Sequence, residues 1–216
     1  MDKLRMRFSK TGRAVYISHL DLMHTFQRAF ARAGYSIRYS EGFNPHPCIS
    51  ILLPLSVGMS SSCEIMDFRI REDCDISEMP ERVTAALPEG IRVLEVYEPE
   101  NKPDELKWLE VNGVFAYDTL PDLEAVKDFF RKEQIVIRKK SKRGMADFDI
   151  VSGIRYMELS EDKNTILLHA VVSAQNPTLN PDLLAEALRQ LAPELAPVYA
   201  SFHRAEVCDF QMKAFR

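Results

Sequence analysis

Residues 42–47, GFNPHP, combine a histidine with residue types that fix the shape of a loop. Gly42 permits an unusual backbone angle, Asn44 can cap its own turn, and two prolines flank and stiffen His46. A histidine on a stiff loop beside a strand can bind a ligand or transfer a proton near neutral pH. The segment therefore predicts a binding or catalytic loop, with a role in the turn and in packing alone as the alternative.

A predicted helix over residues 18–33 provides a second polar surface. Four polar side chains are spaced by three or four positions and so share one face of this helix: Asp21, His24, Arg28 and Arg32. The arginines and the histidine could bind phosphates. The alternative is a solvated helix face, on which these side chains pair with one another at roughly 0.2–0.5 kcal/mol per pair.

His19, near the start of the same helix, is the residue that could act together with His46. The two histidines could provide acid–base catalysis, and Glu64 or Asp67 on a later strand could join them. Two histidines and two carboxylates could also hold a transition metal, but nothing in their spacing requires one. We therefore expect no metal site, and His19 and His46 are the candidate catalytic residues.

Charge is unevenly distributed along the chain. The 28 basic and 32 acidic residues give a net charge of −4, yet residues 131–143 contain seven Lys or Arg and only Glu133 opposes them. Such a run can direct a polyanion to one face of an acidic protein, whereas the alternative is a solvated charged loop. The residues that we expect to contact RNA are Arg28, Arg32, Arg38, Lys139, Lys140, Lys142 and Arg143 for phosphates, and His19, Asn44 and His46 for a base or sugar.

Several motifs of well-known enzyme classes are missing. The sequence contains no GxxxxGK[ST], GxGxxG, GxSxG or CxxxCxxC pattern, which argues against nucleotide hydrolysis, dinucleotide binding, α/β-hydrolase chemistry and a radical-generating cluster. The four cysteines form no CxxC pair, so we expect free thiols. No apolar run approaches the roughly 20 residues of a membrane span, and the N-terminus lacks the apolar stretch of a signal peptide. We expect a cytoplasmic protein with no membrane partner and no cofactor in this chain.

Two similar successions of strands and helices must position these residues. The first half predicts strands at 3–9, 35–39, 49–55, 63–70 and 91–98, and helices at 18–33 and 77–87. After a linker at 100–105 the pattern repeats, with strands at 106–117, 134–139, 154–160, 165–172 and 201–210, and helices at 122–132 and 181–191. This order predicts an α+β protein of two ferredoxin-like (split βαβ) halves, each with an antiparallel sheet and helices on one face. We place the N-terminal half at 1–99 and the C-terminal half, with its basic loop, at 104–216.

Four segments of the chain resemble a known bacterial family. They are SHLDLM (18–23), RAFARAG (28–34), SEGFNPHPCISILLPLSVGMSSSCEIMDFRI (40–70) and LPEGIRVLEV (87–96). They are similar to the radical-SAM-linked domain of unknown function, which is encoded beside, or fused to, a cobalamin-binding radical SAM protein. The resemblance is strongest over residues 3–98 and continues more loosely toward the C-terminus. Two positions depart from the family pattern, because His24 stands where the family has an arginine and Cys48 where it has a lysine.

The resemblance implies a helper of a radical SAM enzyme, with no established reaction of its own. Family genes often lie near those for ribonuclease and large-subunit ribosomal proteins, which implies tRNA or rRNA as the RNA partner. LPEGIRVLEV is also similar to a segment of tRNA pseudouridine synthases, which have two ferredoxin-like halves, but their catalytic aspartate motif has no counterpart in this sequence. We therefore expect a non-catalytic partner of a radical SAM protein that binds structured RNA and supports its modification or processing.

Two alternatives stay open. The first is an enzyme in which His46 and His19 perform acid–base chemistry on RNA. The second is a scaffold that contacts only the radical SAM protein and no RNA. The sequence does not predict the oligomeric state.

Overall fold

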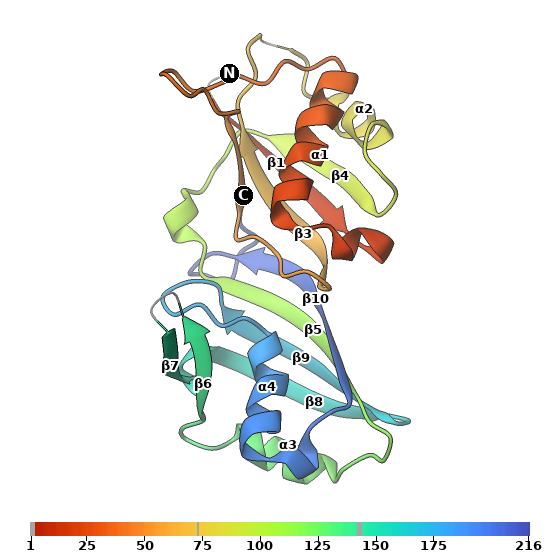
Figure 1. The fold of residues 1–216 in the computed structure, drawn as a ribbon, viewed down its shortest axis with the longest axis vertical. Coiled ribbons are helices and arrows are strands. Elements are labelled where there is room, and N and C mark those ends of the chain that lie inside the picture. Colours follow the sequence, from red (N-terminus) through yellow and green to blue (C-terminus); the bar gives the residue numbers. More distant parts are fainter. Residues whose placement is uncertain (1–2, 73, 142–143) are drawn as a thin grey trace. The chain divides into compact units, whose positions relative to one another are not determined.

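The computed structural model describes residues 3–72, 74–141 and 144–216. The chain divides into two compact units (Figure 1). Unit 1 comprises Met1–Glu105 together with Ala214–Arg216, and unit 2 comprises Leu106–Lys213.

Unit 1 has the βαββαβ order of a split βαβ unit. Its elements are β1 (Leu4–Lys10), the 3-10 turn η1 (Gly12–Tyr16), α1 (His19–Arg32), β2 (Ile49–Leu52), β3 (Ser60–Phe68), α2 (Met79–Ala85), β4 (Ile91–Tyr97) and the 3-10 turn η2 (Pro103–Glu105). The strands lie in the order β4–β1–β3–β2, and each neighbouring pair is antiparallel. Leu4 and Ile49 both lie opposite Phe68, so β1 and β2 begin at the same end of the sheet.

Unit 2 repeats this order and adds a hairpin. Its elements are β5 (Trp108–Ala116), α3 (Leu123–Phe130), β6 (Val136–Ser141), β7 (Gly144–Asp149), η3 (Val151–Gly153), β8 (Ile154–Asp162), β9 (Thr165–Ser173), α4 (Asp182–Leu191), η4 (Pro193–Leu195) and β10 (Tyr199–Cys208). The main strands lie in the order β10–β5–β9–β8, all antiparallel, while β6 and β7 form a separate two-stranded sheet. The predicted fold of two ferredoxin-like halves is confirmed. No helix in the described part of the chain is long and apolar enough to cross a membrane.

The core of unit 1 lies between its sheet and its helices, which Figure 1 shows on one side of β1 and β4. A row of aromatic rings runs through it, with centroids 4.8 Å apart for Phe8 and Phe26, 6.4 Å for Phe26 and Phe30, and 4.9 Å for Phe30 and Phe68. The two helical rings are one turn apart and therefore share the buried face of α1, whose N-terminus is capped by Ser18. Burial of each ring stabilises the unit by about 1.5–3 kcal/mol.

Two arginines connect the C-terminal ends of α1 and α2. Arg32 of α1 donates from Nη2 to the carbonyl of Ala86, just after α2, and Arg82 of α2 donates to the carbonyl of Ala33, just after α1 (2.8 Å). Carbonyls in the last turn of a helix lack intrahelical donors, so each arginine caps the other helix. The guanidinium of Arg32, which the sequence assigned to an RNA phosphate, is therefore engaged inside unit 1.

Residues 35–39, expected as a strand, form only two isolated bridges, from Ile37 to Ile70 and from Tyr39 to Pro47. Proline has no amide hydrogen, so the segment that carries the motif prolines cannot provide a continuous ladder. In unit 2 the strand β7 was not expected from the sequence. Its residues 144–147 are all exposed, so no alternation of apolar and polar residues marks it.

The segment Ala214–Arg216 belongs to unit 1, as do residues 104–105, whereas the sequence placed both in a C-terminal half spanning 104–216. Arg216 contacts both carboxylate oxygens of Glu95 on β4 at 3.0 and 3.2 Å, and its carbonyl accepts a hydrogen bond from Arg5 Nη1 at 2.8 Å. Phe215 is 1% exposed, and its ring centroid lies 4.7 Å from the guanidinium carbon of Arg5. By packing against β1 and β4, the segment covers the buried guanidinium of Arg5.

Arg5 and Asp67 form a buried ion pair beneath this segment. The guanidinium of Arg5, fully buried, donates from Nε and Nη2 to the two carboxylate oxygens of Asp67 at 2.6 and 3.0 Å. Lys3 Nζ lies 2.6 Å from the same carboxylate, and the carbonyl of Asn101 accepts a further bond from Arg5 at 3.0 Å. A buried charge is tolerated only when it is paired and hydrogen-bonded, so Asp67 has a structural role.

Candidate functional site

Residues 38–48, which carry the GFNPHP motif, form a short hairpin that we name the tip hairpin (dark orange in Figure 1). The amide of Cys48 donates to the carbonyl of Arg38 at 2.7 Å. Nearer the tip, the Ser40 amide donates to the His46 carbonyl at 2.8 Å, and the His46 amide donates to Ser40 Oγ at 2.9 Å. These bonds fix the backbone on either side of the motif.

The end of the tip hairpin exposes an aromatic ring, an amide and an imidazole. Phe43 has 112% of its reference exposure, and Asn44 and His46 are exposed as well. Gly42 has a φ of 129°, a conformation that other residues rarely adopt. A fully exposed ring contributes nothing to the core, so Phe43 is available to stack on a partner.

A pocket of about 430 Å³ lies between α1 and the base of the tip hairpin, and we name it the unit 1 pocket. Besides the buried Tyr35, the described polar side chains that line it are Gln27, Ser36, Tyr39 and Arg71. Within the described residues, none of these four side chains makes a hydrogen bond or an ion pair. Among the residues that the structure describes, no carboxylate lines the pocket. Its hydrogen-bonding groups are therefore free to bind a ligand.

Four arginines in this part of unit 1 differ in how far they are engaged. Arg28 on α1 and Arg71 after β3 are exposed, and neither has a carboxylate partner among residues 3–72, 74–141 and 144–216. Arg38 lies 3.7 Å from Glu41, whose side chain is 95% exposed, and such a surface pair contributes about 0–1 kcal/mol. Arg32 caps α2. Three cations thus remain available to an anionic partner.

His19 and His46 are not brought together. His19 is the first residue of α1, which starts after the Lys10 end of β1, whereas the tip hairpin leads into β2 at the Leu4 end. The 14 residues of α1 span about 21 Å between these ends. Proton transfer between two side chains needs contact or one bridging water, so the two histidines do not form an acid–base pair.

Two of the basic residues predicted for the second half, Lys139 and Lys140, lie on β6 of unit 2. Lys139 Nζ lies 3.4 Å from the centroid of the Phe148 ring, and burial lowers the pKa of Lys139 below its usual value. Lys140 is exposed to solvent. Lys142 and Arg143 lie outside the residues that the structure describes. Of the four residues of the basic run that we expected to contact phosphates, one exposed lysine and one half-buried lysine can thus be placed.

One side chain of α4 makes two hydrogen bonds to the backbone of the β6–β7 hairpin. The carboxamide of Gln190 accepts a hydrogen bond from the amide of Arg138 and donates one to its carbonyl, both at 3.0 Å. This exchange imitates the pairing of two strands. It fixes β6 next to α4.

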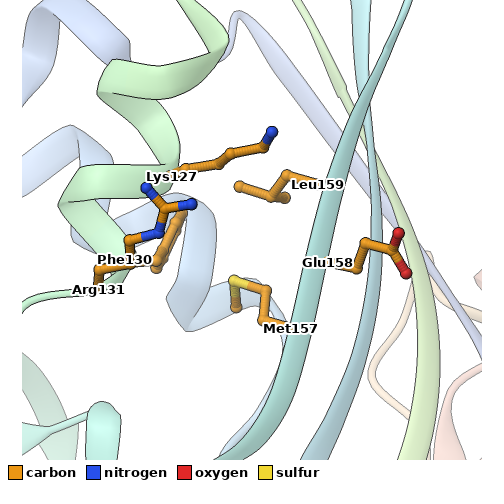
Figure 2. A pocket seen from close by; sticks show the side chains of 6 residues that line it. All are labelled: Lys127, Phe130, Arg131, Met157, Glu158 and Leu159. Carbon is orange, nitrogen blue, oxygen red and sulfur yellow. The ribbon is translucent and has the colours of Figure 1, made fainter.

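A second pocket, of about 280 Å³, lies between α3 and β8 in unit 2 (Figure 2). Its cations are already neutralised, because Lys127 Nζ lies 2.8 Å from Glu124 and Arg131 Nη1 lies 2.8 Å from Asp128. The hydrogen bond from Lys127 holds the pKa of Glu124 below its usual range. Figure 2 shows Glu158 pointing away from both cations. This pocket is therefore a weaker candidate than the unit 1 pocket.

Reasoning from the sequence identified only part of this region. It placed Arg28 on the surface of one helix and Asn44 and His46 on one loop, where the structure has them, whereas it placed Arg38 on an expected strand where the structure has the tip hairpin. It missed Gln27, Tyr39, Phe43 and Arg71. Aromatic residues beside GFNPHP are a signal that could have been used for Tyr39 and Phe43, whereas only the fold places Gln27 and Arg71 at a common pocket.

Comparison with solved structures finds a similar fold at a TM-score above 0.5, and weaker matches. A chain of a crystal structure of a Cbf5-Nop10-Gar1 complex matches 94% of this chain and 48% of its own length, at 10% identity and a TM-score of 0.51. This chain thus spans about half the length of that one, and the likeness shows the fold alone. An unknown protein from Galdieria sulphuraria (11% identity, 93% and 95% covered) and the acetolactate synthase small subunit from Thermotoga maritima (12% identity, 94% of each covered) both have a TM-score of 0.27.

No curated protein matches the chain. A family described as an uncharacterized protein conserved in bacteria, DUF2344, matches residues 3–181. This stretch covers most of the chain and includes the tip hairpin, the unit 1 pocket and the β6–β7 hairpin. The chain therefore belongs to the DUF2344 family of uncharacterized bacterial proteins.

Proposed function

We propose that this protein binds structured RNA, tRNA or rRNA, as a non-catalytic partner of a radical SAM enzyme, and that unit 1 makes the main contact. The observation that carries the proposal is the exposed ring of Phe43 on the same unit as the exposed arginines Arg28, Arg38 and Arg71. Arginines bind phosphates, and exposed aromatic rings stack on unpaired bases in loops and bulges of folded RNA.

Other features support parts of this proposal. The resemblance of SHLDLM and GFNPHP to the radical-SAM-linked domain supports the class of protein partner and the choice of tRNA or rRNA. Lys139 and Lys140 on the β6–β7 hairpin add a second basic element in unit 2. The separation of His19 from His46 favours binding over acid–base catalysis by that pair.

The test is a filter-binding titration against total bacterial tRNA and rRNA fragments at about 50 and about 200 mM salt. Each phosphate contact adds about 0.7–0.9 to the slope of log K against log salt. Arg28→Gln and Arg71→Gln should each lower the slope by about this amount. Arg13→Gln, at an exposed arginine in η1, is the matched control and should leave the slope unchanged. An equal slope in all four proteins would contradict the assignment of these arginines.

The scaffold alternative has an observation of its own. Tyr16 and Leu20, at the start of α1, are 72% and 70% exposed. The amide of Gly58 donates to the carbonyl of Val15 at 3.0 Å, which brings the exposed Val57 to the same end of unit 1. Exposed apolar side chains that gather in one place mark surfaces for protein partners. Copurification with the radical SAM protein after nuclease treatment, lost in Leu20→Asp, together with no RNA affinity, would favour the scaffold.

A further inference from the structure

We infer that the unit 1 pocket receives one nucleotide, whose base lies on the ring of Tyr39 and is hydrogen-bonded by Gln27 and Ser36, and whose phosphate is bound by Arg71. The nucleotide is either an unpaired residue of RNA or a free mononucleotide. The RNA source rests on the function proposed above.

The size and lining of the pocket fit such a ligand. Its volume of about 430 Å³ lies within the roughly 300–1,000 Å³ range of small-molecule sites. Ile37 and Pro47 provide apolar walls, and the ring of Tyr39 is 46% exposed. Aromatic rings on which unpaired bases stack are the common feature of proteins that read single-stranded RNA.

The hydrogen-bonding groups match the two chemically distinct parts of a nucleotide. The carboxamide of Gln27 offers two donors and one acceptor, the combination that reads a base edge, and Ser36 adds a hydroxyl. Among the described residues that line this pocket, Arg71 alone is charged, and a guanidinium binds phosphate through two parallel hydrogen bonds. A neutral aromatic base with one attached anion satisfies all four side chains, whereas a bare anion would leave the amide and the ring without a partner.

The position of the pocket also fits an RNA source. It opens at the base of the tip hairpin, whose end carries Phe43, Asn44 and His46. An RNA strand held at the tip and by Arg28 would pass the mouth of the pocket. One base leaving the stack can then enter, at a cost of a few kcal/mol that stacking on Tyr39 partly offsets.

The experiment is a titration of the 15N-labelled full chain with four probes, 5′-AMP, 5′-GMP, 5′-CMP and 5′-UMP, followed through the side-chain amide signal of Gln27. Ribose 5-phosphate serves as the probe without a base. We expect at least one mononucleotide to shift the Gln27 signal at concentrations where ribose 5-phosphate does not. Tyr39→Leu should lower the affinity for that mononucleotide about 5- to 150-fold, which corresponds to the loss of one stacked base, and Tyr39→Phe should keep the affinity of the unchanged protein.

Matched controls separate a local effect from unfolding. Tyr199→Leu removes a more accessible tyrosine, 61% exposed, from unit 2 and should leave mononucleotide binding unchanged. The bridge between Tyr39 and Pro47 is formed by backbone hydrogen bonds of the flanking residues 38, 40, 46 and 48, and the Tyr39 side chain makes no hydrogen bond among the described residues, so its substitution should preserve the remaining amide spectrum. Equal losses in Tyr39→Leu and Tyr199→Leu, or equal binding of ribose 5-phosphate and the mononucleotides, would overturn the inference.

The outcomes also distinguish this inference from the proposed function. Binding of tRNA or rRNA in the filter assay with no shift of Gln27, by RNA or by any mononucleotide, refutes the pocket and leaves RNA binding standing. If a mononucleotide shifts the Gln27 signal, Tyr39→Leu abolishes that shift and no RNA binds, the pocket is supported as a site for free nucleotides and RNA binding is refuted. A Gln27 shift by both kinds of probe supports the unpaired RNA residue.

Discussion

Substitution of Asp67 by Asn should destabilise unit 1 by about 3–5 kcal/mol, because it leaves a buried charge without its counter-ion. Asp67 is 5% exposed, and its two carboxylate oxygens accept the hydrogen bonds that Nε and Nη2 of Arg5 donate. Asparagine keeps the shape but presents an NH2 group to one of these donors. The carbonyls of Asn101 and Arg216 remain as acceptors for Arg5, yet they carry no charge to neutralise it. Lys3, 38% exposed in its side chain, can turn to solvent.

Urea unfolding followed by far-UV circular dichroism measures this effect. With a slope of about 2 kcal/mol/M, the expected loss moves the midpoint down by about 1.5–2.5 M. The double variant Arg5→Met, Asp67→Leu removes both charges. Its free energy of unfolding should fall less than that of Asp67→Asn alone, since an apolar pair can replace a buried ion pair at little cost. A loss below about 1 kcal/mol for Asp67→Asn, or a larger loss for the double variant, would refute this reasoning.

Three further predictions concern single side chains. Burial raises the pKa of Tyr117 to about 12, so between about pH 10 and pH 12 the folded state keeps a proton that the unfolded chain releases. The free energy of unfolding should therefore fall by about 2 kcal/mol across this window. Unfolding curves recorded at each pH should show a smaller fall for Tyr117→Phe. Gly90→Ala should cost about 2–3 kcal/mol in thermal or urea unfolding, because φ is +90° and a Cβ would collide with the carbonyl oxygen of Thr11. Gln190→Ala should speed amide exchange of Arg138 at least about 10-fold, since it removes both bonds that attach β6 to α4; unchanged protection would show that other contacts hold the hairpin.

Local patterns were sufficient to predict most of the fold. The alternation of β1 places Leu4, Met6 and Phe8 on the buried face, as the sequence indicated. Ser18 caps α1, and Gly34 follows its end with a φ of 85°, so both boundary signals of that helix were physically meaningful. The order of strands and helices then left few sheet topologies, because a split βαβ unit places its first strand beside its third and fourth.

The candidate site could not be predicted to the same extent, because it depends on contacts between distant segments. The sequence shows Arg32 as a free cation on a polar helix face, and only the approach of α2 reveals the carbonyl that engages it. His19 and His46 belong to neighbouring motifs, yet the length of α1 separates them. Gln27 and Arg71 meet at one pocket only after β3 has brought the residues behind it against α1.

The contact between Arg5 and Arg216 joins two positions 211 residues apart, with all of Leu106–Lys213 between them. A ribosome adds about 5–20 residues per second, so roughly 6–24 s of translation separate the completion of β4 from the arrival of Phe215. During this interval the nascent unit 1 presents Arg5 without its cover, although its strands and helices are all synthesised. The N-terminal unit therefore matures last, and a ribosome that stalls within the C-terminal unit leaves behind an unfinished N-terminal one.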